Sequence, residues 1–178
     1  MNEKLKLFWE VGGTMISSTP HARELGIQFV AIGEGQATLS LPYGAHLVGD
    51  VGTGVVHGGA VTTLLDQACG LAAFTGFDTL GALATLSLRI DYQRAARPRE
   101  TIVGIAECYK TTKHVAFLRA VAHDGDETDP VATAQATFMS TGPRLSFEDA
   151  IRSRLAKAEA RQAAVARSEA KAKGETQP

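Results

Sequence analysis

The sequence has little of what marks several specialised classes of protein. It contains only two cysteines in 178 residues, too few for a disulfide framework or a cysteine-rich metal site. We therefore expect two reduced thiols in a reducing compartment. The formal net charge is −1, so no strong field favours nucleic acid or an anionic membrane as a partner.

Long apolar runs and targeting signals are also missing. No run in the sequence approaches the roughly 18 apolar residues of a membrane span. The stretch MNEKLKLFWEVGG carries an acid and only a short apolar segment, unlike a secretory signal peptide. These absences predict a cytoplasmic protein, and an apolar fraction of 44% is typical of a globular one.

Hydrophobic periodicity divides the chain into helical and strand-rich parts. Helical spacing predicts a short helix over residues 3–16 and a long apolar helix over about residues 58–75. Between them, residues 27–43 are typical of a hairpin. From Leu83 onward a period of two predicts four strands, in segments 82–95, 101–112, 114–124 and 130–141. This order predicts an α+β fold in which an antiparallel sheet packs against one principal helix.

The composition changes near residue 145. Residues 145–178 are rich in alanine and in charges of both signs, with few aliphatic side chains. We expect one domain over residues 1–144, including the first helix, followed by a helical or disordered tail.

The long helix carries a carboxylate, Asp66, within an apolar segment. Thr62, Thr63, Asp66 and Gln67 form a narrow polar stripe along it, because positions four apart share a helix face. Two interpretations stay open. The stripe faces water and Asp66 is a solvated charge, or the stripe lines a cleft in which Asp66 acts as a general base or nucleophile.

The segment His57-Gly58-Gly59 precedes this helix and favours the cleft. Glycines at a helix N-terminus leave backbone N–H groups open to an anion or to an oxyanion that forms during acyl transfer. Gly59 and Asp66 are seven residues apart, which is about 10.5 Å along a helix. One reacting carbon cannot lie roughly 3 Å from both groups. If both are catalytic, two antiparallel copies of the helix must meet in at least a dimer.

These motifs together resemble a known family. The segment Gly52–Gly59, with its His-Gly-Gly end, is followed by Leu64-Leu65-Asp66-Gln67-Ala68. The combination resembles the PaaI-like branch of the hotdog-fold acyl-CoA thioesterases, over about residues 20–142. The resemblance implies a hotdog fold, in which an antiparallel sheet wraps around a long central helix, and a homodimer or homotetramer.

The resemblance also implies catalytic roles. Asp66 would be the catalytic carboxylate, as general base or as nucleophile. The N–H of Gly59 would polarise the thioester carbonyl, and His57 would help to bind or orient it. Thr85 matches a position that places the attacking water.

Further residues are expected to bind the substrate. Gly58 belongs to the same helix start, and Asp50 stands near a position where many relatives carry asparagine. A carboxylate accepts hydrogen bonds but cannot donate as an amide does, so Asp50 could instead cap its loop. Arg94, Arg97 and Arg99 supply cations, and we expect one or two of them to contact the phosphates of coenzyme A.

The sequence therefore predicts an acyl-CoA thioesterase that acts without a metal or other cofactor. Two alternatives remain: a non-catalytic hotdog protein that binds acyl-CoA, and a dehydratase or hydratase of the same fold. The retained Asp66 and His57-Gly58-Gly59 segment argue against the first. A dehydratase or hydratase of this fold resembles the chain less, because its catalytic histidine and acid have a different spacing from that of His57 and Asp66.

Overall fold

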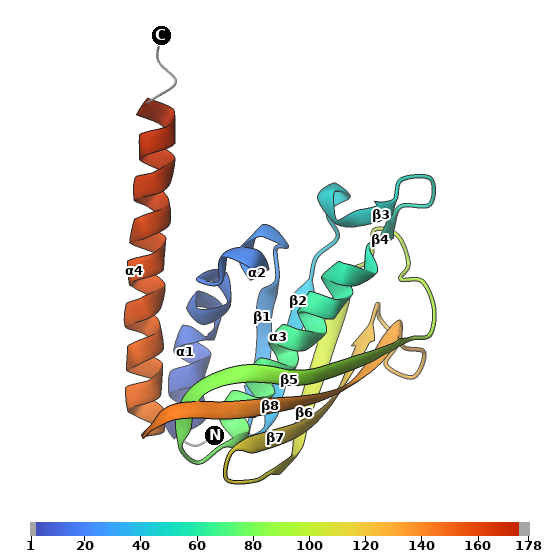
Figure 1. The fold of residues 1–178 in the computed structure, drawn as a ribbon. Coiled ribbons are helices and arrows are strands. Elements are labelled where there is room, and N and C mark those ends of the chain that lie inside the picture. The colour runs from blue at the N-terminus through green and yellow to red at the C-terminus, as the bar shows by residue number, and fades with distance from the viewer. Residues whose placement is uncertain (1–2, 175–178) are drawn as a thin grey trace.

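The computed structural model describes residues 3–174 and is drawn in Figure 1. The helices are α1 (Glu3–Ser17), α2 (Pro20–Glu24), α3 (Gly58–Gly76) and α4 (Phe147–Gly174), with a short 3-10 turn at Ala45–Leu47. The strands are β1 (Gln28–Gly33), β2 (Gln36–Leu41), β3 (Val48–Asp50), β4 (Val55–Val56), β5 (Leu80–Tyr92), β6 (Ile102–Thr111), β7 (Val115–His123) and β8 (Ala132–Leu145).

The strands form one large antiparallel sheet and a small hairpin. Six strands follow the order β1-β2-β6-β7-β8-β5, and β3 pairs with β4. The large sheet curves around α3, which packs mainly on β2, β6 and β7 (Figure 1). The predicted α+β arrangement, with a sheet wrapped around a long central helix, is confirmed. The β3–β4 hairpin was missed because its strands are too short to show alternation.

Close packing between α3 and the sheet forms the core. Leu64, Leu65 and Ala68 on α3 are fully buried, and each large side chain buried in this way contributes about 1.5–3 kcal/mol to stability. Gly104 on β6 permits the contact, because a Cβ there would come within 2.9 Å of Leu64 Cγ. The helix that carries Asp66 is therefore held rigidly against the sheet.

Strand β5 forms one edge of the sheet. It pairs with β8 only, and its register shifts between Thr85 and Ser87. Leu86, between these two residues, has 53% of its surface exposed. Over the described part of the chain, no strand pairs with the outer edge of β5.

The N-terminal and C-terminal helices lie together against one end of the sheet. Phe8 of α1 is fully buried, with its ring centroid 5.5 Å from that of Phe74 on α3. Ile151, near the start of α4, is also fully buried, and α4 packs on α1. Beyond these turns α4 extends away from the body (Figure 1). Within the alanine-rich segment, α4 spans residues 147–174, while residues 175–178 lie outside the described residues.

Both cysteines are free thiols. Cys69 is fully buried in α3, and this burial raises the pKa of its thiol to about 12. It therefore stays protonated at neutral pH and packs as an apolar side chain. Among the helices of residues 3–174, none combines the length and hydropathy that a membrane crossing requires.

Candidate active site

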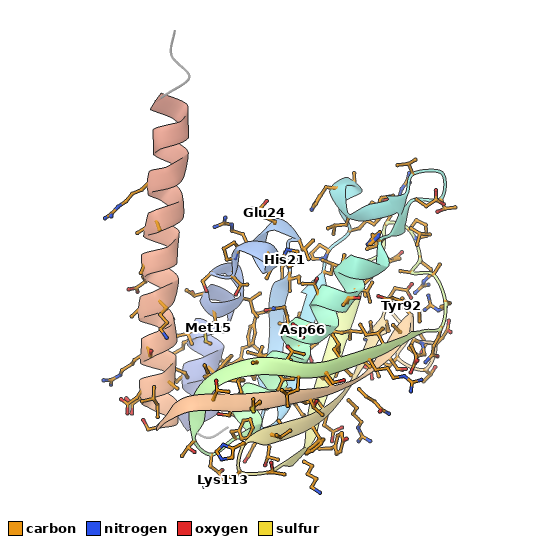
Figure 2. All side chains as sticks on the ribbon, in the orientation of Figure 1. Met15, His21, Glu24, Asp66, Tyr92 and Lys113 are labelled. Carbon is orange, nitrogen blue, oxygen red and sulfur yellow. The ribbon has the colours of Figure 1, made fainter. Side chains whose placement is uncertain are left out.

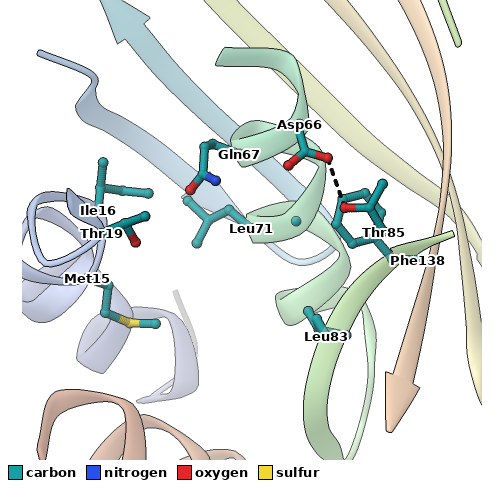
Figure 3. Close-up of a pocket in the computed structure, with 10 residues that line it drawn as sticks. Met15, Ile16, Thr19, Asp66, Gln67, Leu71, Leu83, Thr85 and Phe138 are labelled. Atoms are coloured by element: carbon teal, nitrogen blue, oxygen red, sulfur yellow. Dashed lines mark hydrogen bonds between the residues drawn. The ribbon is translucent and has the colours of Figure 1, made fainter. Parts of the chain in front are cut away.

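A cavity of about 220 Å³ lies beside the middle of α3 (Figure 3). Asp66, Gln67, Gly70 and Leu71 of α3 line it. Opposite walls come from the α1–α2 region, from β5 and from β8. Two residues of the polar stripe, Asp66 and Gln67, therefore border a cavity, which is the position that the second interpretation of the sequence requires.

Asp66 is held by a residue from the edge strand. The Thr85 hydroxyl of β5 donates a hydrogen bond of 2.9 Å to Oδ1 of Asp66 (Figure 3). Asp66 is half-buried, so water can still reach its carboxylate. Among the described residues, no hydrogen bond to the second oxygen, Oδ2, is found. The structure thus brings together two of the predicted catalytic residues and leaves one carboxylate oxygen free for chemistry.

His57 caps the start of α3. Its Nδ1 accepts a 2.9 Å hydrogen bond from the backbone N–H of Gly59. A neutral imidazole that accepts at Nδ1 carries its proton on Nε2. Because His57 is exposed, this Nε2–H is available to a ligand.

The cap decides which backbone N–H is open at the start of α3. The sequence predicted Gly59 as the donor, but its N–H is already engaged by His57. For the N–H of Gly58, the first residue of α3, no acceptor is present among the described residues. The open donor at the helix start is therefore Gly58. The rotamer of the His57 side chain decides which N–H is free, and a sequence does not reveal a rotamer.

Tyr92 is a site residue that sequence reasoning missed. Its hydroxyl donates a 2.6 Å hydrogen bond to the carbonyl oxygen of Gly58 and lies 2.9 Å from Oγ1 of Thr62. Figure 2 shows it at the end of β5, toward the N-terminus of α3. The contact fastens β5 to the first turn of α3, across 34 residues of sequence. Only the tertiary fold could have indicated it.

Asp50 holds a turn near this helix start. Its Oδ1 accepts from the N–H of Gly52 at 3.0 Å, and its Oδ2 accepts from the hydroxyl of Thr53 at 2.6 Å. The hydrogen bonds from Thr53 and Gly52 lower the pKa of Asp50 below its ordinary value. The carboxylate thus caps the turn between β3 and β4, which is the alternative that the sequence left open.

Arg94 is bound within the protein. Its guanidinium makes two hydrogen bonds, of 2.9 and 2.7 Å, to the carboxylate of Asp124. Its Nε also lies 2.9 Å from Oδ2 of Asp129. The Asp124 side chain is fully buried, and the hydrogen bonds from Arg94 hold its pKa well below the ordinary range. Arg94 therefore joins the β5–β6 loop to the β7–β8 turn.

The other two predicted arginines differ in their contacts. Arg97 donates its backbone N–H to Asp124 at 2.7 Å, and its guanidinium also contacts Asp124, although 59% of the side chain is exposed. Arg99 is exposed and has a positive φ of 70°. Across the described residues, its side chain has no hydrogen bond or ion pair. Of the three arginines, Arg99 therefore has the guanidinium group most available to a ligand.

The two ends of the candidate site are far apart within one chain. Gly58 and Asp66 are eight residues apart on α3, or about 12 Å along the helix axis. Within residues 3–174, no group of three or more His, Cys, Asp or Glu side chains is arranged to hold a metal ion. The chemistry available is that of a carboxylate, backbone N–H groups and an imidazole.

Comparison with known proteins places this arrangement in a family. Residues 53–131 match the family model of the thioesterase superfamily. The medium/long-chain acyl-CoA thioesterase YigI of Escherichia coli is 28% identical over 142 residues, which cover 72% of this chain and 90% of YigI. A crystal structure of a Pseudomonas aeruginosa protein is 38% identical, with a TM-score of 0.67, over 74% of this chain and 98% of that one.

A solved structure of lower identity supports the fold. The PaaI protein from the phenylacetic acid degradation operon of Escherichia coli superimposes with a TM-score of 0.69 at 19% identity, over 81% of this chain and all of PaaI. This chain belongs to the thioesterase superfamily and has the hotdog fold. The matched segment, residues 53–131, contains α3 and β5 but neither α1 nor α2.

Proposed function

We propose that this protein is an acyl-CoA thioesterase, which hydrolyses an acyl-CoA thioester to the free acid and coenzyme A. The observation that carries the proposal is the position of Asp66 on the cavity wall, with one oxygen fixed by Thr85 and the other free. Membership in the thioesterase superfamily and the similarity to YigI support it.

The free oxygen of Asp66 supplies the chemistry. As a general base, it accepts a proton from a water molecule whose oxygen attacks the thioester carbonyl carbon. The tetrahedral intermediate then collapses, the C–S bond breaks, and the sulfur leaves with the bonding electron pair. Thiols are far stronger acids than alcohols, with an ordinary pKa near 8.5 for cysteine, so the thiolate of coenzyme A is a good leaving group and takes up a proton afterwards. Direct attack by Asp66 on the carbonyl is the alternative.

The start of α3 polarises the carbonyl in this mechanism. The N–H of Gly58 donates to the carbonyl oxygen as negative charge develops, and the positive end of the helix dipole favours that charge. His57 has two functions here. Its Nδ1 engages Gly59, while its Nε2–H binds or orients the same carbonyl or the adjacent sulfur.

The site requires two protomers. About 12 Å along the helix separates Gly58 from Asp66, so Gly58 of one protomer serves Asp66 of its partner. The unpaired edge of β5 supports this arrangement, because a long exposed edge strand is a surface for pairing with another chain. Two β5 strands related by a two-fold axis would bring two α3 helices side by side in opposite directions. We propose a homodimer with two shared sites.

In this proposal, the β5–β6 loop binds the coenzyme A part of the substrate. Arg99 is exposed and without a protein partner among the described residues, so we propose that it contacts a phosphate of coenzyme A, assisted by Arg97. Arg94 acts indirectly, because its pairing with Asp124 fixes the loop that carries both.

The release of free thiol tests the function. We expect the wild type to release coenzyme A from at least one member of a panel of phenylacetyl-, benzoyl- and straight-chain acyl-CoAs. Asp66→Asn keeps the shape of the side chain but removes the base, so its turnover should fall by about 10²–10⁴-fold. Asp91→Asn is the matched control, because Asp91 lies on the same strand as Thr85 but outside the cavity that contains Asp66.

Two outcomes would contradict the proposal. Wild-type turnover in Asp66→Asn would remove Asp66 from the mechanism. Tight binding of acyl-CoAs without hydrolysis of any of them would instead favour a non-catalytic acyl-CoA-binding protein.

A further inference from the structure

The cavity beside Asp66 continues along an apolar path. On α3, Leu71 follows Gln67 by one turn, and on β5, Leu83 precedes Thr85 by two residues. Figure 3 shows Leu71 and Leu83 on the same side of the Asp66–Thr85 pair. One helical turn rises about 5.4 Å and two strand residues about 6.6 Å. The path thus leads roughly one turn away from the carboxylate, between α3 and β5.

The far wall of the cavity comes from the N-terminal helices. Met15 and Ile16 of α1 and Thr19, just before α2, face α3 across the cavity (Figure 3). These residues precede the segment 53–131 that matches the family model. Met15 is half-buried, whereas Ile16 is 5% exposed. A half-buried methionine is flexible and can adapt to the end of an apolar ligand.

Gly70 gives the cavity its width on the α3 side. Glycine inside a helix is unfavourable relative to alanine, and Gly70 lies well inside α3 without a positive φ. A Cβ at this position would lie 3.3 Å from Cε1 of Phe138, and both residues line the cavity. Alanine would therefore place a methyl group tightly against the Phe138 ring, on a part of the cavity wall where glycine presents only backbone.

We propose that this cavity holds the acyl group of the substrate, and that Met15 and Gly70 limit the length of the chain it accepts. The inference rests on the proposed thioesterase function and names its substrate class, an apolar acyl group of modest length. A volume of about 220 Å³ is below the roughly 300–1,000 Å³ of sites for drug-sized ligands. The specificity of this protein is thus set in part by α1, which lies outside the residues 53–131 that match the family model.

Opposite changes on the two walls test the inference. Gly70→Ala narrows the cavity. We compare kcat/KM for the longest acyl-CoA that the wild type hydrolyses efficiently with kcat/KM for acetyl-CoA. The ratio of the first value to the second should fall by about 10-fold or more in Gly70→Ala. Met15→Ala lengthens the cavity, and the same profile should move toward longer chains. Straight-chain acyl-CoAs in two-carbon steps are the probes.

Each variant has a matched control. Gly13→Ala makes the same exchange in an exposed helical position with no atom within 4 Å of the new Cβ. Leu7→Ala shortens another partly buried side chain of α1 that does not line the cavity. Both controls should keep the wild-type chain-length profile.

The outcomes separate this inference from the proposed function. Opposite shifts in Gly70→Ala and Met15→Ala, with unchanged profiles in the controls, would support it. A uniform loss at all chain lengths, or profiles equal to those of the controls, would overturn it while Asp66-dependent hydrolysis still stood. No Asp66-dependent hydrolysis of any acyl-CoA would overturn both.

Discussion

His57 determines which backbone N–H stays free at the start of α3. By accepting from Gly59, it removes one donor from solvent and leaves the N–H of Gly58 open. Its own backbone, with φ −61° and ψ 133°, is extended in the way that residues before proline prefer. Proline can therefore follow His57 without strain, and a proline at position 58 would remove the N–H donor.

Gly58→Pro should abolish carbonyl polarisation and keep the helix. Proline lacks the N–H and is well tolerated at the first position of a helix. Loss of one donor of this kind reduces kcat by about 10²–10³-fold. Gly58→Ala is the control, because it also adds a Cβ, about 3.2 Å from the Tyr92 hydroxyl, but keeps the N–H. Equal kcat values for the alanine and proline variants would remove Gly58 from the mechanism.

The sequence indicated some site residues and not others, for physical reasons. Asp66 was identifiable because a charge in an apolar helix is costly unless it has a use or a solvent path. The roles of Gly58 and Tyr92 depend on one rotamer and on a contact between distant segments, and neither leaves a local pattern. The same holds for Arg94, whose pairing with Asp124 forms only when two loops meet.

At the scale of elements, the Arg94–Asp124 pair connects the β5–β6 loop to the β7–β8 turn. The carboxylate of Asp124 also accepts the backbone N–H of Arg97. A charge buried this completely is stable only while its partners remain. The loop that carries the proposed phosphate-binding arginines therefore depends on one buried aspartate.

Acid should weaken this connection in a defined pH range. The pKa of Asp124 is lower in the folded chain than its ordinary value of about 3.9 in an unfolded one. Its contribution to the free energy of unfolding is fully present above about pH 4, and it is lost as the pH falls below that value toward the folded-state pKa.

Asp124→Asn should remove about 3–5 kcal/mol from the free energy of unfolding at neutral pH. The free energy of unfolding of this variant should also fall less steeply below about pH 4 than that of the wild type. Urea unfolding at several pH values measures both effects. Asp129→Asn, at the exposed partner of Arg94, should cost much less. An unchanged acid profile in Asp124→Asn would contradict the assignment.

The elements were more predictable than their connections. The long apolar run of α3 and the alternation in β5 to β8 arise from burial on one face, which the sequence records directly. The β3–β4 hairpin and the burial of Ala150 and Ile151 near the start of α4 depend on tertiary contacts. Alanine-rich, charged sequence gives little indication of a docking face, so the contact of Ile151 was not foreseen.

At the scale of the whole molecule, the proposed site needs two copies of the chain. In the proposed dimer, one protomer would supply Asp66, Thr85 and the acyl cavity, and its partner would supply Gly58, His57 and the arginine loop. The open edge of β5 is the surface on which the two would join. Neither protomer alone would hold a complete site.

Mixing two inactive variants tests whether each site is shared between two protomers. Asp66→Asn and Gly58→Pro chains would be co-expressed with different tags, and the release of coenzyme A measured for the purified mixed dimer and for each parent. A shared site predicts that the mixed dimer contains one intact site of its two, and that a random mixture recovers about one quarter of wild-type activity. A mixed dimer as inactive as its parents would show that both groups act within one protomer, and would contradict a site shared between protomers.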